Sequence, residues 1–184
     1  MNKFDAKSKM KKYLKSHFIK FHEDVYDGTD RFTVLYKGYE KSPDKVIESC
    51  IYFYEDGMEC RVYYTATGAK WCENSKYIPE FMRLLNYINA RVWPCGSDGM
   101  GGALYTASYL YAPRLYMTED GCYDITMTTI IPYDFYEIAP LETEDFITAC
   151  CPELMNALSP TIFMLLLGTL SLEDAIQAIK RDIL

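Results

Sequence analysis

Short strand-forming segments separated by tight turns constrain the fold of this chain more than any other feature. Residues 31–39, 46–54 and 59–66 are rich in β-branched and aromatic side chains. The stretch "KSPD" at 41–44 separates the first two segments, and "EDG" at 55–57 separates the second from the third. Proline presets a turn conformation and glycine supplies angles that other residues avoid, so both stretches are turn signals. We therefore predict a three-stranded antiparallel meander.

A second group of strand signals follows in the other half of the chain. Residues at about 103–111, 114–118 and 122–131 have strand composition, and another "EDG" turn at 119–121 joins the last two. Between the two groups, residues 79–92 begin with a proline and carry apolar side chains at helical spacing. A helix thus separates the first meander from a second one.

Helices are expected at both ends of the chain. Over about 5–23, apolar side chains recur at three- and four-residue steps and form one stripe opposite the lysines. At the other end, Thr143 can cap a helix and Pro160 can begin a second one. An S-x-x-D capping signature at Ser171 predicts a last helix that ends near residue 182.

The resulting order is α-βββ-α-βββ-α, without the βαβ alternation of parallel sheets. This order predicts an α+β fold, with one or two antiparallel sheets and the helices packed on one face. A chain of 184 residues is long enough to bury a sizeable core, and we expect a single domain over residues 1–184.

Charge is unevenly distributed along the chain. Residues 1–20 hold seven lysines and one aspartate, a net charge of +6. Because the whole chain carries −7, the remaining residues carry −13. Nucleic-acid binding needs clustered lysine and arginine against the phosphate backbone, so this acidic body argues against a nucleic-acid partner. The basic N-terminus fits either a solvated helix face lying on its own acidic body or a contact with an anionic partner.

The apolar segments indicate a soluble, cytoplasmic chain with no membrane span. The N-terminal lysines are not followed by the apolar stretch of a signal peptide. Residues 154–172 run 19 positions without a charge, near the length of a spanning helix. Polar residues, proline and glycine interrupt this stretch, so we expect a buried core or subunit-contact helix. Within it, Ile162, Phe163 and Leu166 are the candidate contacts of a homodimer.

The cysteines do not form a metal-binding or disulfide pattern. The chain has seven of them, an odd number, and no pair has C-x-x-C spacing. Only two histidines are available as further ligands. Buried free thiols in a reducing compartment explain this pattern better than a zinc site, and we expect no metal and no cofactor.

No set of residues forms a catalytic motif, and we expect no enzymatic activity. His17 and His22 are the only side chains that ordinarily titrate near neutral pH, and on one helix they would not face the same way. The glycine-rich segment 95–102 follows a predicted helix and precedes a strand, the reverse of the order in a phosphate-binding loop. Asn86 and Asn89 share one side of a helix end and are expected to cap it or hold the neighbouring loop.

Three stretches resemble a known family. They are "YIPEFMRLLNYINARV", the strand pair around "LYMTEDGCYDI", and "SPTIFMLLLGTLSLEDAI", which together span about residues 77–176. These stretches are similar to the YbjN-type family, bacterial proteins described as sensory transduction regulators. The most specific part runs from Gly168 to Ile176, where an apolar helix is followed by glycine and a short acidic helix start. The resemblance implies a type III secretion chaperone-like fold and a binding or regulatory role rather than a known reaction.

Tyrosine is the most unusual component of the chain. Of its 17 tyrosines, all but Tyr13 lie between positions 26 and 136. Period-two alternation places several of them on one strand face together with charged residues, opposite an aliphatic face. The candidate protein-binding face consists of Tyr52, Tyr54, Arg61, Tyr63, Tyr105, Tyr109 and Tyr111. Tyrosine is enriched in protein interfaces, although it also fills cross-strand pairs within sheets, and both interpretations stay open.

These observations favour a non-enzymatic protein-binding or regulatory module with an unidentified protein partner. One alternative is a small enzyme or small-molecule binder with a pocket near residues 95–102. Another is an immunity-type protein whose acidic body neutralises a basic toxin.

Overall fold

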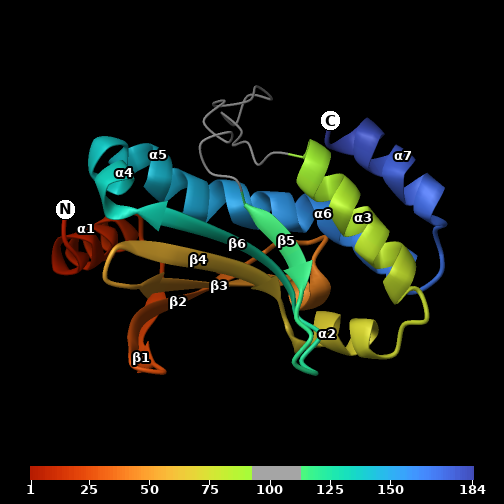
Figure 1. Cartoon of the computed structure of the whole chain (residues 1–184), viewed down its shortest axis with the longest axis horizontal. Coiled ribbons are helices and arrows are strands. Elements are labelled where there is room, and N and C mark those ends of the chain that lie inside the picture. The colour runs from red at the N-terminus through yellow and green to blue at the C-terminus, as the bar shows by residue number, and fades with distance from the viewer. Residues whose placement is uncertain (93–112) are drawn as a thin grey trace.

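A six-stranded antiparallel sheet with helices packed against it gives the protein an α+β fold, as predicted (Figure 1). The computed structural model describes residues 1–92 and 113–184. The strand order is β1-β2-β3-β4-β6-β5, and every neighbouring pair is antiparallel. The predicted strand 103–111 and the glycine-rich segment 95–102 lie outside the described residues.

The strands are β1 (Phe21–Tyr26), β2 (Thr29–Lys37), β3 (Val46–Phe53), β4 (Gly57–Tyr64), β5 (Arg114–Met117) and β6 (Ile125–Pro132). The first predicted meander is confirmed as β2, β3 and β4, and the predicted strands 114–118 and 122–131 correspond to β5 and β6. β6 begins three residues later than expected because Gly121 and Tyr123 both have positive φ, at 86° and 57°, which extended strands do not use.

The N-terminal helix is shorter than predicted. α1 spans Lys3–Ser16, and Phe18, expected on its apolar stripe, is 92% exposed. Residues 21–26, assigned to the helix and the break after it, instead form β1. An Asp27–Gly28 turn with φ of 47° and 74° joins β1 to β2. Asp-Gly between strands is a strong hairpin signal, and this local turn outweighs the helical spacing upstream.

The described strands of the two predicted meanders belong to one sheet. Two helices follow β4. The first, α2 (Ala66–Glu73), was not predicted, and the second, α3 (Ile78–Arg91), confirms the predicted helix 79–92. The chain then returns so that β6 pairs directly with β4, with Met58 opposite Ile131, and β5 forms the far edge.

The C-terminal helices begin earlier than predicted. They are α4 (Tyr133–Ile138), α5 (Pro140–Asp145), a π-helical segment η3 (Phe146–Cys150), α6 (Cys151–Leu166) and α7 (Leu172–Asp182). Thr143 is not a cap but lies inside α5, where its hydroxyl donates to the carbonyl of Ala139. Pro160 does not begin a helix but lies inside α6, whose burial compensates for the lost backbone hydrogen bond. The last helix is confirmed, and its Ser171 cap accepts from the backbone N–H of Asp174 at 3.1 Å.

The predicted dimer contact is wrong, because its residues lie in the core. Ile162, Phe163 and Leu166 are 0%, 5% and 2% exposed. The Phe163 ring packs against the rings of Tyr64 in β4 and Trp71 in α2, with centroids 5.0 Å apart in both pairs. α6 is apolar nearly all round because the sheet, α3 and α7 surround it.

One helical run in the described part of the chain, Pro140–Leu166, has the length and apolar composition of a membrane span. Within it, 67% of the most apolar window is buried against the rest of the fold. Burial of this kind is what the core helix of a soluble protein shows, in agreement with the interpretation of 154–172 as a core helix.

Candidate protein-binding face

The side chains that the strands direct away from the helices form the candidate site. Along β3, Ile47, Ile51 and Phe53 are fully buried in the core, so the residues between them face the other way. Cross-strand register extends this outward set over β1, β2 and β4. We call it the tyrosine face, and it consists of Tyr26, Arg31, Glu48, Tyr52, Tyr54, Glu59, Arg61 and Tyr63.

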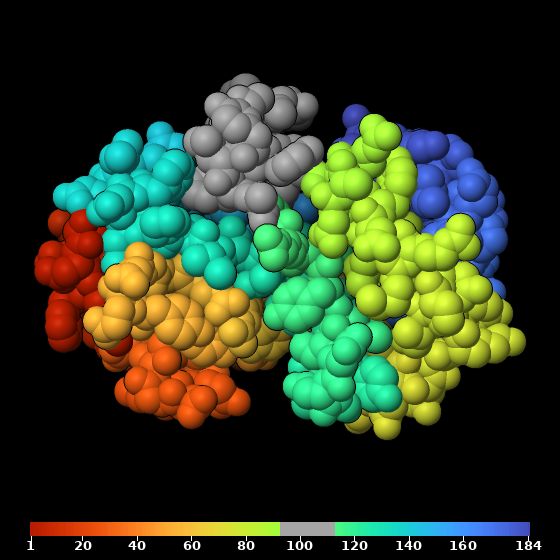
Figure 2. Space-filling view, in the orientation of Figure 1, coloured from red at the N-terminus to blue at the C-terminus, as the bar shows by residue number. Residues whose placement is uncertain are grey.

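The tyrosine face lies on the side of the sheet away from α1 and α6. Both helices pack on the opposite face, where Met10 and Ile162 share one core with Phe32 and Ile51. Among the described residues, the side-chain hydrogen bonds and ring contacts of the tyrosine face stay within the sheet and its turns. In Figure 2 the β1–β2 hairpin (orange) and the turn between β5 and β6 (green) project with a hollow between them.

A row of paired residues crosses this face. Asp24 on β1 lies opposite Arg31 on β2, Arg31 opposite Tyr52 on β3, and Tyr52 opposite Glu59 on β4. Directly opposite residues on one face of an antiparallel sheet have their side chains within contact distance. Acidic, basic and aromatic groups therefore alternate across four strands.

Arg31 is held from two sides. Its guanidinium donates two hydrogen bonds to Asp24, Nε to Oδ1 at 2.9 Å and Nη2 to Oδ2 at 2.6 Å. Its central carbon lies 4.6 Å from the ring centroid of Tyr26 and 5.8 Å from that of Tyr52. The hydrogen bonds from Arg31 hold the pKa of Asp24 below its usual value. Because a bidentate pair fixes the guanidinium plane, the neighbouring rings are held in one geometry.

Glu59 organises the middle of the face. It accepts hydrogen bonds from Arg61 Nη2 at 2.8 Å, from Thr128 Oγ1 at 2.8 Å and from Tyr54 Oη at 3.1 Å. Burial alone would raise the pKa of Glu59, but these donors outweigh burial and hold the pKa below its usual value. Arg61 lies 4.8 Å from the Tyr52 ring centroid, and its buried Nε has no partner in the described part of the chain.

Tyr63 completes the face next to β3. Its hydroxyl donates to Glu48 Oε1 at 2.8 Å and lies 3.0 Å from the sulfur of Cys50. Burial raises the pKa of Tyr63, so it remains a neutral donor across the physiological range. Cys50 is completely buried beneath the rings, which makes it a packing group rather than an accessible nucleophile.

The arrangement is rigid, aromatic and balanced in charge. Each arginine has a carboxylate partner, so the face has no uncompensated cation among its described residues to attract a polyanion. Tyr26 is 56% and Tyr54 40% exposed, whereas Tyr52 is 7% exposed between the two arginines. Aromatic rings with fixed planes and polar tips are suited to contact with another protein surface.

The structure brings together the predicted residues that it describes. Tyr52, Tyr54, Arg61 and Tyr63 share one face, as the alternation predicted. The other three predicted members, Tyr105, Tyr109 and Tyr111, lie outside the described residues. Tyr26 was missed because residues 21–26 were assigned to a helix and the break after it. Arg31 was missed although its strand was predicted, because its neighbour β1 was not. The Asp-Gly turn that follows Tyr26 was the signal that could have revealed this strand pair.

The remaining candidates have structural positions. Asn89 exchanges two hydrogen bonds with the backbone of Leu115, at 2.9 and 2.8 Å, and so joins α3 to β5. His17 is the C-cap of α1, and His22 lies in β1 rather than on a helix. Within residues 1–92 and 113–184, no three His, Cys, Asp or Glu side chains are placed to hold a metal ion.

The cysteines of the described part are free thiols, and all of them except Cys122 are buried. Burial raises the pKa of both Cys60 and Cys72 to about 12. A thiol with so high a pKa is protonated at neutral pH and is a poor nucleophile.

Comparison with known proteins gives no relative for this chain: no family model, no curated protein and no solved structure matches it.

Proposed function

We propose that this chain is a cytoplasmic, non-enzymatic protein-binding or regulatory module that holds a partner protein on its tyrosine face. The observation that carries the proposal is a sheet face on which Tyr26 and Tyr54 are exposed, while two arginines, each paired with a carboxylate, contact the rings of Tyr26 and Tyr52. Tyrosine and arginine are the side chains that contribute most binding energy in protein interfaces.

The rigidity of the face supports this assignment. Binding loses affinity when mobile side chains must be ordered, at a cost of about 0.5–1.5 kcal/mol for each one. Here Arg31 and Arg61 are already held by hydrogen bonds and by the rings beside them. A partner would meet an ordered surface with two exposed rings, Tyr26 and Tyr54, at its margin.

The order of elements is compatible with the YbjN-type resemblance and its chaperone-like fold. The predicted order has an antiparallel sheet with helices on one face, which leaves the other face available to a partner. A regulatory protein of this type would act by holding its partner rather than by chemical turnover. The proposed partner is a protein, and the proposal involves neither a nucleic acid nor a membrane.

A second candidate is an immunity-type protein that binds a basic toxin. The specific observation is that the lysines of α1 are partly used internally. Lys7 pairs with Glu23 and Asp30, at 3.0 and 2.6 Å, and Lys11 also pairs with Glu23. The basic N-terminus thus lies on its own acidic hairpin, while exposed acidic residues elsewhere, such as Glu119 and Asp120, could meet a basic partner.

The test compares the tyrosine face with an exposed apolar position elsewhere. We would purify the wild-type chain, a Tyr26→Ser/Tyr54→Ser variant and an Ile138→Ser control from the native cell. Ile138 is 82% exposed at the end of α4 and is not part of the tyrosine face. Proteins that co-purify would be identified, produced separately and measured by titration calorimetry.

We expect the double variant to bind the identified partner about tenfold or more weakly, and the control to bind as wild type does. Equal affinity of the double variant and the wild type would contradict the proposal. Partner binding that disappears at high salt in all three chains would support the immunity-type alternative instead.

A further inference from the structure

The end of β2 has an open edge. β1 pairs with β2 only from Tyr26–Thr29 to Phe21–Val34, whereas β2 continues to Lys37. On its other side β2 stays paired with β3 as far as Lys37 opposite Val46. Among the described residues, no strand pairs with residues 35–37 along the edge of β2 that faces β1. We call this unpaired stretch the β2 edge.

Backbone groups of Lys37 point toward this open side. The N–H of Gly38 donates to the carbonyl of Lys45 at 3.0 Å, so residue 38 faces β3. Because backbone groups alternate in direction along a strand, Lys37 presents its N–H and C=O to the other side. The two-residue turn at Asp27–Gly28 leads to the same assignment, since the pair flanking such a turn exchanges hydrogen bonds and sets the alternation of β2.

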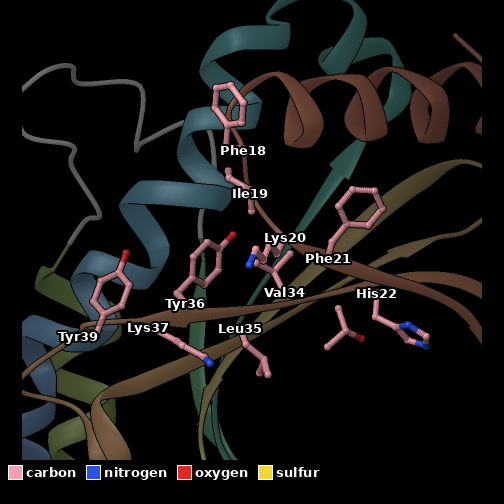
Figure 3. A pocket seen from close by; sticks show the side chains of 11 residues that line it. Phe18, Ile19, Lys20, Phe21, His22, Val34, Leu35, Tyr36, Lys37 and Tyr39 are labelled. Atoms are coloured by element: carbon pink, nitrogen blue, oxygen red, sulfur yellow. The ribbon is translucent and has the colours of Figure 1, made fainter.

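A hollow of about 730 Å³ lies at this edge (Figure 3). On the side that packs against the core it is lined by Ile19, Phe21, Tyr36 and Tyr39. Phe18 stands at its rim and is 92% exposed, in a left-handed conformation with φ of 58°. A hydrophobic patch beside unpaired strand groups is the combination that an added strand requires.

The outer side of the same hollow is basic. Lys20, His22, Leu35 and Lys37 line it, and the whole lining contains no carboxylate. Lys20 and Lys37 form no ion pair with the described residues, in contrast to Lys7 and its two carboxylate partners. In a chain of net charge −7 this local excess of positive charge favours an acidic partner at this hollow.

We infer that the β2 edge accepts an extended peptide segment of a partner protein whose residues alternate between acidic and apolar. The segment lies in line with β1 and exchanges backbone hydrogen bonds with Lys37. Its apolar side chains enter the core side of the hollow, and its carboxylates meet Lys20 and Lys37. Period-two alternation of a strand sends successive side chains to opposite faces, which matches the two different sides of this hollow.

The charges argue against a second copy of this chain at the same edge. Self-pairing through the β2 edge would bring two copies of Lys20 and Lys37 together, and like charges in close cross-strand positions destabilise pairing. The site is also distinct from the tyrosine face, so the inference does not rest on the proposed function.

The probe is the peptide Ac-Glu-Val-Glu-Ile-Glu-NH2, titrated into the ¹⁵N-labelled full chain and followed by NMR. We expect the backbone amides of Leu35 and Lys37 to shift. A Lys20→Glu/Lys37→Glu variant should bind about tenfold or more weakly, because both charge partners are reversed. The matched control, Lys12→Glu/Lys15→Glu, makes the same charge change on α1 and should bind as wild type does, as should Tyr54→Ser.

Two N-methylated forms of the peptide test strand pairing directly. One is methylated at the glutamates and the other at the apolar residues, so that each blocks a different edge of the added strand. We expect one form to bind as the parent does and the other to lose about tenfold in affinity or more.

Equal binding of both methylated forms would overturn the inference, because side-chain contact alone would then explain binding. An unshifted Lys37 amide at about 1 mM peptide would also overturn it. So would a Lys37 amide that shifts with protein concentration in the absence of peptide, since a second copy would then occupy the edge.

Discussion

Removing the charge of Glu59 tests how the tyrosine face is held together. Its carboxylate is 12% exposed and accepts hydrogen bonds from Arg61, Thr128 and Tyr54. Glu59→Gln removes the charge that Arg61 faces and keeps one of the two acceptor oxygens, while the other becomes an amide donor. The substitution therefore removes the ionic interaction together with one acceptor, at nearly unchanged side-chain volume.

The expected cost follows from the geometry. A hydrogen bond to a charged group contributes about 1.5–3 kcal/mol, and exposure reduces this figure. Because the Arg61 side chain is 38% exposed, we expect Glu59→Gln to lower the free energy of unfolding by about 1–2 kcal/mol at pH 7.

The pH dependence has a definite sign. The pKa of Glu59 is held below its ordinary value of 4.5 in the folded chain. Its contribution to stability is therefore complete above pH 4.5 and is lost as the pH falls through the folded pKa. The difference between wild type and Glu59→Gln should shrink toward zero in acid.

The assay is urea unfolding of both chains at neutral and at acid pH, with Glu119→Gln as the control. Glu119 is exposed and loses the same charge without a comparable set of donors among the described residues. A stability difference that is the same at both pH values would refute the reasoning, because the effect could not then come from the ionised carboxylate. So would a Glu119→Gln variant that loses as much stability as Glu59→Gln.

Three further substitutions and one control, Met164→Ala, test the packing and a buried carboxyl group. Phe163→Ala should lower the free energy of unfolding by about 3–5 kcal/mol, whereas Met164→Ala, at a 40% exposed position, should lower it by less than about 1 kcal/mol. Urea unfolding measures both values. If Phe163→Ala left stability intact and changed the elution volume in size-exclusion chromatography, Phe163 would be a dimer contact and not a core residue. Gly168→Ala should cost about 2 kcal/mol or more, because φ is 74° and the added Cβ would overlap the Tyr77 ring; a thermal midpoint equal to that of wild type would contradict this. Burial raises the pKa of Glu144, so the folded chain binds this proton more tightly than the unfolded chain does, and wild-type stability should fall as the pH rises above 4.5. Glu144→Gln should remove this fall. A free energy of unfolding that decreases equally with pH in both chains would contradict the prediction.

Much of the fold was accessible from local patterns. The strands β2, β3 and β4 could be predicted because alternation and turn residues act over a few positions, and α7 because Ser171 satisfies its own helix end. α1 was overextended because Phe18 and Phe21 continue the helical spacing, although the first is exposed and the second belongs to a strand. Spacing does not reveal which apolar residues the tertiary structure will bury.

The candidate site shows the same limit at longer range. Alternation alone placed Tyr52, Tyr54, Arg61 and Tyr63 on one face, because period two is a property of each strand. It could not show that β6 would join β4, or that Arg31 would lie between two rings, since both depend on pairing between distant segments. The dimer contact was misplaced for the same reason: an apolar helix buried in its own core and one buried in a partner have the same composition.

Electrostatics distinguishes the proposed modes of binding from one another. The arginines of the tyrosine face are neutralised by their own carboxylates, so binding there should depend weakly on salt. Two lysines and no carboxylate line the hollow at the β2 edge, so attraction to an acidic segment should fall as salt shortens the screening length to about 8 Å near 0.15 M. An immunity-type contact through the acidic body should also weaken as salt is added. The Lys20→Glu/Lys37→Glu variant would strengthen that contact, because the added negative charge attracts a basic toxin. The same variant therefore weakens one ionic mode and strengthens the other, and it leaves the tyrosine face unchanged.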